Sequence, residues 1–332
     1  MSDPNADFQP PPPPLEPIVA KRARAVRLRM PAIVLFVLGV LLVIAALVKI
    51  LPISFGTGAA FCFFGALLFA FSFIPLPDEP PDAEPPMSLG QKLGAIFYEP
   101  SRVFRNLRVH PHWLAPFIII SVLTAVYTAA FTQRLTPERI VNHTMDKVVE
   151  AGFATPEVIE QQRQDEIEKA KRPINRVASA AQQFVGVFAL TCVVAALYLL
   201  AVTIFGGRIN FWQSLAVVFW ASLPVVLINK IISLIILFVK DPDDVHPILA
   251  QETLVQDNLG VLFTPGQNPI LFVAGSAIGV LSLYSLWLRA KGLQYGGTKA
   301  SSTAAWSAAI SVWLLGVVIG ITFAALFPSF IS

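Results

Sequence analysis

Acidic side chains are missing from the long apolar stretches of this sequence, and charged residues are scarce throughout. Only 14% of the 332 residues are charged, compared with about 25% in a typical soluble domain. Hydrophobic residues make up 55%, and the mean hydropathy is +0.67. This composition predicts a polytopic membrane protein. The net charge of +3 is too small to indicate nucleic-acid binding.

Catalytic signatures are also missing. The sequence has no HExxH, GxSxG or Walker A motif. The lack of carboxylates in the apolar stretches excludes an aspartyl-protease dyad and most proton relays. Of four histidines, only His110 and His112 are close enough in sequence to share a site, and beside Trp113 they are typical of a membrane interface. The two cysteines, Cys62 and Cys192, are expected to be free thiols. We therefore expect no enzyme, no cofactor and no metal.

Seven apolar stretches are long enough to cross a bilayer, which takes about 20 residues in a helix. Their backbone polar groups must bond internally in hydrocarbon, so each stretch is expected to be helical. The predicted fold class is an all-α, polytopic transmembrane helical bundle. The stretches are 31–52, 55–76, 113–132, 183–205, 213–239, 270–289 and 305–328.

The distribution of basic residues predicts the orientation. Five of them, Lys21, Arg22, Arg24, Arg27 and Arg29, precede the first stretch. Lys and Arg are in excess on the cytoplasmic side of membrane proteins, so we expect a cytoplasmic N-terminus. An odd number of spans then places the C-terminus outside.

Four parts follow along the chain. A Pro-rich and basic cytoplasmic tail (1–30) precedes a transmembrane hairpin (31–76). A cytoplasmic linker with an amphipathic interfacial segment (77–112) leads into a five-span bundle (113–332). The first two spans of that bundle are joined by a charged external loop (133–182), in which two Thr-Pro-Glu sequences are typical of helix starts.

The segment 88–109 combines apolar side chains at helical spacing with basic ones. Its second half sets Val103, Phe104 and Leu107 against Arg102, Arg105 and Arg108. In one interpretation the arginines meet anionic lipid or a partner while Phe104 and Leu107 enter the membrane interface. In the other, the segment is a solvated connector that packs on the bundle.

The stretch 213–239 holds the candidate polar cluster inside the membrane: Ser222, Asn229, Lys230 and Ser233. The two serines and Asn229 fall on one helical face, with Lys230 beside them. Hydrocarbon offers these groups no partner, so neighbouring helices should supply one. Lys230 could bind an anion, hold carbonyl groups together with Asn229, or extend along its stem to the interface.

Two pairs of glycines have small-xxx-small spacing, which permits close helix approach. They are Gly275 with Gly279 and Gly316 with Gly320. The close approach is expected within one chain or between copies in a homo-oligomer.

Three motifs, EPSRVFRNLRVHPHWLAPFII, GGRINFWQSLAVVFWASLP and YSLWLRAKGLQ, occur in this order from Glu99 onward. In order and spacing the chain resembles the Yip family (Ypt-interacting proteins). The matching positions are Pro100, Phe104, Pro111, Trp113, Pro116, Gly206, Gly207, Phe211, Ser214, Pro224, Trp287 and Gly292. The charged loop 133–182 is similar to that of bacterial members, which implies a bacterial inner membrane.

The resemblance implies that the last five stretches form one compact bundle without catalytic residues. Eukaryotic relatives bind Rab-type GTPases through their N-terminal region, which here is a Pro-rich tail and an additional hairpin. We therefore expect a membrane scaffold or organiser that engages membrane lipids, or protein partners through the tail or the external loop. The alternative is a small transporter or channel with a polar path around Lys230.

Overall fold

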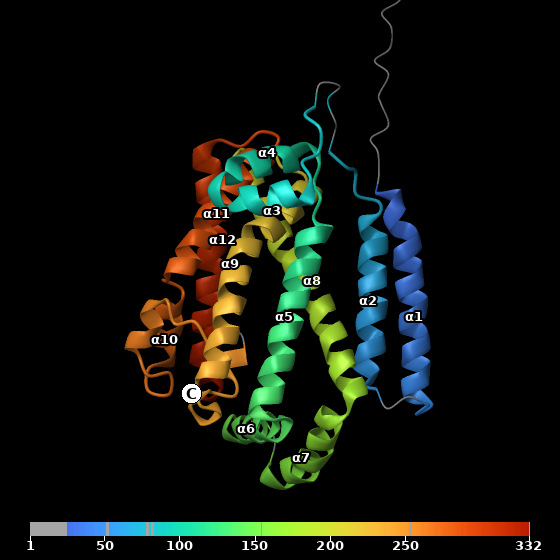
Figure 1. Ribbon diagram of the computed structural model, residues 1–332, viewed down its shortest axis with the longest axis vertical. Coiled ribbons are helices and arrows are strands. Elements are labelled where there is room, and N and C mark those ends of the chain that lie inside the picture. The colour runs from blue at the N-terminus through green and yellow to red at the C-terminus, as the bar shows by residue number, and fades with distance from the viewer. Residues whose placement is uncertain are drawn as a thin grey trace, which may run out of the picture.

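The computed structural model describes residues 25–50, 53–77, 80, 83–153, 155–251 and 254–331. These residues form twelve α-helices and five short 3-10 helices, and among them no β-strand occurs beyond two isolated bridges (Figure 1). The predicted all-α fold class is therefore confirmed. Residues 1–24, with the prolines and the first basic residues of the predicted tail, lie outside the described part.

Five helical segments are long and apolar enough to cross a membrane. They are Val26–Leu47 (the 3-10 turn η1, Val26–Leu28, and α1, Arg29–Leu47), α5 (Leu114–Leu135), α8 (Pro173–Ile204), α9 (Phe211–Val239) and α12 (Ser302–Leu326). The apolar α2 (Phe55–Phe71) is shorter. The predicted stretch 270–289 is not one helix, because it is divided between α10 (Pro269–Ser276) and α11 (Val280–Gly296). The prediction of seven continuous spans is therefore wrong for this stretch.

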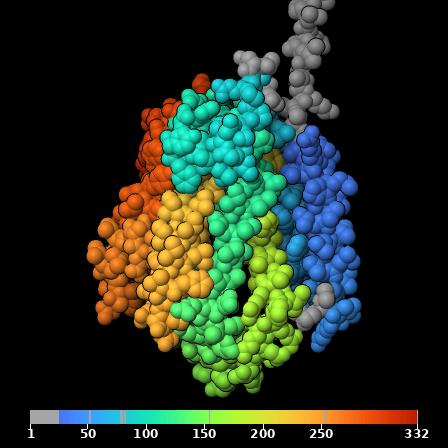
Figure 2. Space-filling view, in the orientation of Figure 1, coloured from blue at the N-terminus to red at the C-terminus, as the bar shows by residue number. Residues whose placement is uncertain are grey.

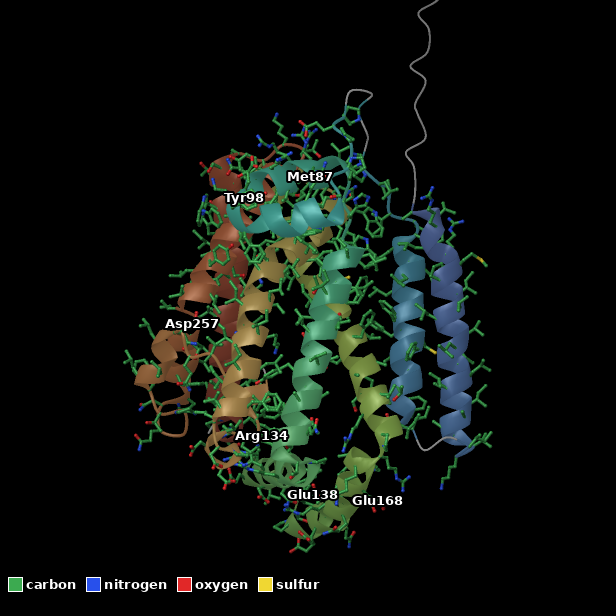
Figure 3. All side chains as sticks on the ribbon, in the orientation of Figure 1. Met87, Tyr98, Arg134, Glu138, Glu168 and Asp257 are labelled. Atoms are coloured by element: carbon green, nitrogen blue, oxygen red, sulfur yellow. The ribbon has the colours of Figure 1, made fainter. Side chains whose placement is uncertain are left out.

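The break between α10 and α11 is held by the preceding loop, which folds back on it. The backbone N–H of Leu259 donates to the carbonyl of Ile278 at 3.0 Å. The Asp257 carboxylate accepts from the N–H of Leu281 at 2.6 Å and so satisfies one unpaired donor of the first turn of α11. Figure 3 shows Asp257 midway along the molecule, away from both ends. The loop therefore places an acidic side chain midway between the two ends of the molecule, although none of the seven apolar stretches contains an acidic residue.

The glycines of the broken stretch allow this loop to approach. A Cβ on Gly275 would lie 2.8 Å from the backbone nitrogen of Gly260, and one on Gly279 would lie 2.8 Å from Cβ of Asn258. The close approach predicted for Gly275 and Gly279 is therefore made within the chain, to a loop instead of a helix. A Cβ on Gly316 would meet open space, and one on Gly320 would lie 3.1 Å from Val273.

The first half of α9 lies at the centre of the bundle. Every side chain from Trp212 to Ala221 is buried, and α9 packs against α4 (Pro100–Val109), α5, α8 and α11. The helix begins after the paired-glycine turn, where Gly206 has a φ of 80° that favours glycine. A capping box starts α9, with the Asn210 side chain accepting from the N–H of Trp212 at 2.9 Å.

Two pairs of short helices close opposite ends of the molecule. In Figure 1, α3 (Leu89–Tyr98) and α4 lie across one end, and α6 (Pro137–Glu150) and α7 (Pro156–Lys171) lie at the other. The apolar face of α4 turns inward, because Val103, Phe104 and Leu107 are fully buried in the main core. The expectation that Phe104 and Leu107 enter lipid was wrong. The alternative, a connector packed on the bundle, describes the structure.

Glycines also bring α1 and α2 into backbone contact. A Cβ on Gly39 would lie 2.5 Å from the backbone nitrogen of Cys62, and one on Gly65 would lie 2.6 Å from that of Phe36. Small residues of this kind let membrane helices pack closely without a hydrophobic driving force. The α1–α2 hairpin contacts the rest of the bundle where α2 packs against α8.

We expect Gly65→Ala to destabilise this hairpin, because the added methyl group would strike the backbone of α1. Overpacking of this kind costs about 1–3 kcal/mol. The midpoint of thermal unfolding in detergent should fall. The matched control is Gly316→Ala, which adds the same methyl group to a helix facing open space. Equal midpoints for the two variants would contradict the proposed contact.

Candidate functional site

Lys230 and Ser233 of the predicted polar cluster lie beneath the loop that follows α9. Lys230 is only 6% exposed, and its ammonium lies 4.4 Å from the ring centroid of Tyr127 on α5. This is a cation–π geometry. The Ser233 hydroxyl, also buried, accepts from the N–H of Leu254 at 3.1 Å. Asn229, next to Lys230, and Ser222, two turns earlier in the helix, are partly exposed.

A small second core covers this region. The Tyr127 hydroxyl donates to the carbonyl of Ala250 at 2.6 Å, which ties the loop to α5. The core consists of Tyr127, Phe131, Leu135, Leu237, Val245 and Ala250. None of the four residues of the polar cluster lines either of the two cavities described below. The expectation that a neighbouring helix would supply contacts agrees with the position of Tyr127.

The three arginines of α4 form an exposed basic face on the side opposite its buried apolar stripe. Arg102 lies 3.7 Å from Glu99 in an exposed ion pair, and the guanidinium of Arg105 lies 5.8 Å from the ring centroid of Tyr295. Arg108 is also exposed. The backbone of α4 is held in place, since Gln213 of α9 donates to the carbonyl of Arg108 at 2.7 Å. A rigid helix therefore presents the three charges.

A buried lysine and a histidine meet at the same end. Lys92 of α3 is 2% exposed, and its Nζ lies 3.1 Å from Nδ1 of His112. An ammonium can only donate, so Nδ1 accepts and His112 is neutral in this contact. Burial lowers the pKa of Lys92 to about 8. Burial first, then the charges of Lys92 and His110, hold the pKa of His112 below its usual range.

This pair is not among the contacts predicted from the sequence. Lys92 lies four residues before Ile96, so it falls on the apolar face of α3. The position of a lysine on that apolar face was the signal in the sequence that could have indicated its burial. Contact with His112 depends on how α3 folds against the start of α5, and this is not visible in the sequence.

A cleft of about 1110 Å³ with a mixed polar and apolar lining lies between α5 and α8 toward the α6–α7 end, and residues of the α1–α2 turn, α6 and α7 also border it. Figure 2 shows the surface hollowed between the green α5 and the yellow-green α8. At the inner end of the cleft, Gln183 donates to the Thr128 hydroxyl at 3.2 Å and so joins the two helices. The neighbouring Gln182 donates to Ser54 and Thr57, at 3.2 and 2.9 Å, and joins α8 to α2.

The charged residues lining the cleft are four cations and one acid: Lys49, Lys169, Arg172, Arg176 and Glu166. Lys169 donates to Glu166 at 2.6 Å, and Arg172 pairs with Glu168. Arg176 donates only to the Ala170 carbonyl, at 3.4 Å. Within the described residues, neither Arg176 nor Lys49 makes an ion pair. The cleft therefore carries uncompensated positive charge.

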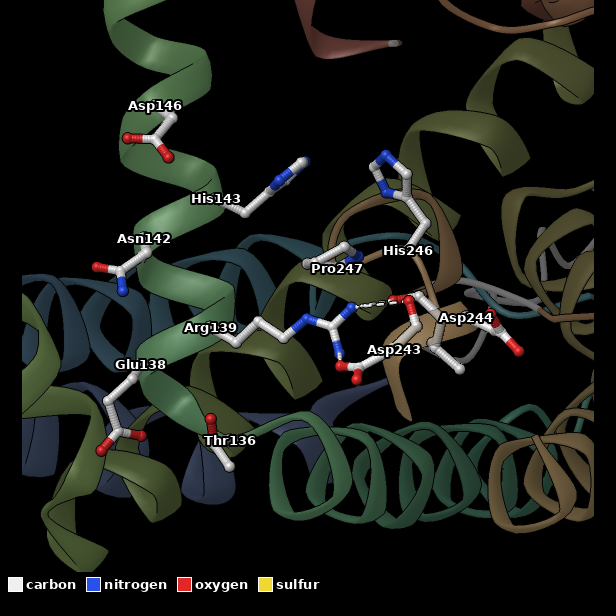
Figure 4. Close-up of a pocket in the computed structure, with 11 residues that line it drawn as sticks. Thr136, Glu138, Arg139, Asn142, His143, Asp146, Asp243, Asp244, His246 and Pro247 are labelled. Carbon is white, nitrogen blue, oxygen red and sulfur yellow. Dashed lines mark hydrogen bonds and ion pairs between the residues drawn. The ribbon is translucent and has the colours of Figure 1, made fainter. Parts of the chain in front are cut away.

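A shallower cavity of about 750 Å³ lies where α6 meets the loop after α9 (Figure 4). Arg139 holds that loop, donating to the carbonyl of Pro242 at 2.6 Å and to the Asp243 carboxylate at 3.2 Å. The rings of His143 and His246 meet edge to face, with centroids 4.9 Å apart. In the part of the chain that the structure describes, no group of three or more His, Cys, Asp or Glu side chains could hold a metal ion.

The residues that carry the family resemblance mostly pack around α9. A Cβ on Gly292 of α11 would lie 2.5 Å from Val217 and 3.1 Å from Phe104, which explains the absence of a side chain there. The other positions are Pro100, buried at the start of α4; Pro111, before α5; Trp113, its ring centroid 5.2 Å from that of Phe188; Pro116, buried in α5; Gly206 and Gly207, in the turn; Phe211, Ser214 and Pro224, in α9; and Trp287, stacked on Tyr284.

One family model, described as the Yip1 domain, matches residues 94–324, which is more than half of the chain. No curated protein and no solved structure matches the chain. The matched region contains the basic face of α4, the Lys230 cluster and most of the cleft between α5 and α8. It leaves out the α1–α2 hairpin.

The Lys92–His112 contact predicts a pH-dependent stability. The unfolded chain takes up a proton at His112 as pH falls through about 6.5, whereas the folded chain does so only at lower pH. The unfolded state then binds more protons, so the free energy of unfolding should decrease as pH falls below this range. Lys92→Met removes one positive neighbour, which raises the pKa of His112 and should make this decrease shallower.

The measurement is the free energy of unfolding in detergent at about pH 7.5 and 5.5. Lys291→Met is the matched control, because the Lys291 ammonium lies over the ring of Tyr295, 5.6 Å from its centroid, instead of a histidine. Identical pH dependence for wild type and Lys92→Met would show that the contact does not tune His112.

Proposed function

Because the chain belongs to the Yip1 domain family, we propose that it is a non-enzymatic scaffold that organises a membrane region by holding a protein partner at its basic face. The long apolar helices and the family together make it an integral membrane protein. The proposal rests on one observation: the three α4 arginines are exposed while the other face of the same helix is locked into the core.

An acidic protein segment is the partner that this geometry favours. The apolar side chains of α4 are used inside the bundle, so the exposed face offers charge and no apolar wedge for a bilayer. Guanidinium groups bind carboxylates bidentately and are enriched at protein interfaces. The fixed backbone of α4 lowers the conformational entropy that binding would cost.

We propose that this face lies on the cytoplasmic side of a bacterial inner membrane. The basic Arg27 and Arg29 precede or begin α1, whose first turn lies at the α3–α4 end in Figure 1. An excess of Lys and Arg marks the cytoplasmic side. The helices α6 and α7 at the opposite end would then face outward, with their acids and bases largely paired with one another.

The transporter hypothesis is the weaker candidate. It needs a polar path around Lys230, Asn229 and Ser222. Lys230 is instead buried against Tyr127, and Ser233 is engaged by the covering loop. A transport role for these residues stays a prediction without a supporting cavity.

Neutralising the basic face should weaken partner binding. We expect the triple variant Arg102→Gln, Arg105→Gln, Arg108→Gln to recover about tenfold less crosslinked partner, since exposed charges contribute up to about 1 kcal/mol each. The measurement is a quantitative crosslinking pull-down from native membranes.

The triple variant Arg102→Lys, Arg105→Lys, Arg108→Lys keeps the charge and removes the bidentate fork. Intermediate recovery is expected for this control. If the Gln variant recovered as much partner as wild type at equal expression, the basic face would not be the binding surface. Binding of anionic lipid by detergent-solubilised wild type and Lys variant but not by the Gln variant, without any recovered protein, would replace the protein partner by lipid.

Lys230→Ala should leave ion permeation unchanged. The reason is that Lys230 contacts Tyr127 and lines neither described cavity. The measurement is chloride flux into proteoliposomes, read with a halide-sensitive dye, for folded wild type and variant at matched protein density. A flux present in wild type and lost in a correctly folded variant would favour the transporter hypothesis.

A further inference from the structure

The cleft between α5 and α8 opens sideways between two membrane-spanning helices. The helix α8 has 32 residues and is therefore about 48 Å long, whereas the hydrocarbon core is about 30 Å thick. Its first turns, with Arg176, must extend into the headgroup region at the α6–α7 end. The two helices are joined by Gln183 and Thr128, and between that bond and the headgroup region the cleft is open.

Small side chains line the walls of the cleft, and they include four alanines beside the polar Thr128, Thr132 and Ser179. Ala125 and Ala129 face it from α5, and Ala178 and Ala180 face it from α8. Short side chains leave width for an acyl chain. Neighbouring residues on α5 are large and exposed, including Val126 at 49%, as expected for a surface that contacts hydrocarbon. The cleft therefore continues into the region of the lipid tails.

The mouth of the cleft provides the opposite chemistry. Lys49 follows α1, Arg172 joins α7 to α8, and Arg176 lies one turn into α8. Arg176 and Lys49 make no ion pair with any described carboxylate. Positive charge at headgroup depth attracts anionic headgroups, and guanidinium groups bind phosphate oxygens directly.

We propose that this cleft binds one anionic phospholipid from the leaflet at the α6–α7 end, with its phosphate between Lys49, Arg172 and Arg176 and an acyl chain along the alanines of α5 and α8. A soluble phosphate would use the cations and leave the apolar walls in contact with water. A neutral lipid would use the walls and leave Lys49 and Arg176 without counter-charges, whereas Arg172 already pairs with Glu168. An anionic lipid satisfies both, because it carries charge and an acyl chain in one molecule.

This inference goes beyond the proposed scaffold function and is independent of it. The cleft lies at the end of the molecule opposite the basic face of α4 (Figure 1). Loss of lipid from the cleft would leave the recovery of a protein partner at α4 unchanged. Loss of that partner would leave lipid retention in the cleft unchanged. Failure of either proposal can therefore be recognised separately.

Native mass spectrometry of the full chain tests the proposal. The protein is released from vesicles containing either phosphatidylglycerol or phosphatidylcholine, and the retained lipid is counted. We expect one phosphatidylglycerol per chain and no retained phosphatidylcholine. The double variant Lys49→Gln, Arg176→Gln should retain about tenfold less phosphatidylglycerol, as expected from losing two interfacial cations.

Two further variants separate charge from shape. Lys171→Gln with Lys240→Gln removes two exposed cations from the same end of the molecule, outside the cleft lining, and should retain lipid as wild type does. Ala129→Leu narrows the cleft without changing charge and should lose the lipid. This variant is expected to fold, because Ala129 is exposed.

Four outcomes would overturn the proposal. The first three are equal retention of both lipids, equal retention by wild type and the Lys49–Arg176 variant, and displacement of the lipid by glycerol phosphate at millimolar concentration. The third result would identify a site for a soluble anion. Loss of lipid in the Lys171–Lys240 control as well would show general surface electrostatics instead of a site.

Discussion

The enclosed first half of α9 is the constraint on which the rest of the structure depends. Ten consecutive residues, Trp212 to Ala221, are buried, so helices must cover this segment on every side. Its polar side chains are satisfied by those neighbours: Ser214 donates to the Ala195 carbonyl of α8 at 2.7 Å, and Gln213 donates to the carbonyl of Arg108. Because α4 is one of these covering helices, the position of the basic face follows from the packing of α9.

The same requirement for internal hydrogen bonds explains the loop between α9 and α10, which folds back on the break before α11. A helix broken within a membrane exposes backbone donors that lipid cannot satisfy. Asp257 and its own backbone carbonyl satisfy donors at the start of α11, and Ser233 accepts from the backbone N–H of Leu254 earlier in the same loop. Lys230 lies beneath this cover, against Tyr127. The polar groups on this side of the bundle thus hold a folded segment in place.

The two ends of the molecule differ in how they hold charge. At the α3–α4 end, the arginines of α4 are presented on one rigid face. At the α6–α7 end, most acids and bases pair with each other, as in the pairs Arg163–Asp146 and Lys171–Glu138. Lys49 and Arg176 at the mouth of the cleft depart from this pairing with described residues, and they border the cleft where two spanning helices separate. The exposed cations on which the two proposals rest are therefore found at opposite ends of the molecule.

The sequence by itself determined the fold class, most of the membrane-crossing helices and the separation of Arg102, Arg105 and Arg108 from the apolar face of α4. Hydropathy and helical periodicity are local properties, and they suffice for these features. Only the tertiary structure decided that Phe104 faces the core, that 270–289 is broken, and that distant segments form the cleft. Each depends on contacts between residues far apart in the chain, such as Asp257 with Leu281 and Gln182 with Thr57, and a single sequence carries no periodic signal for such contacts.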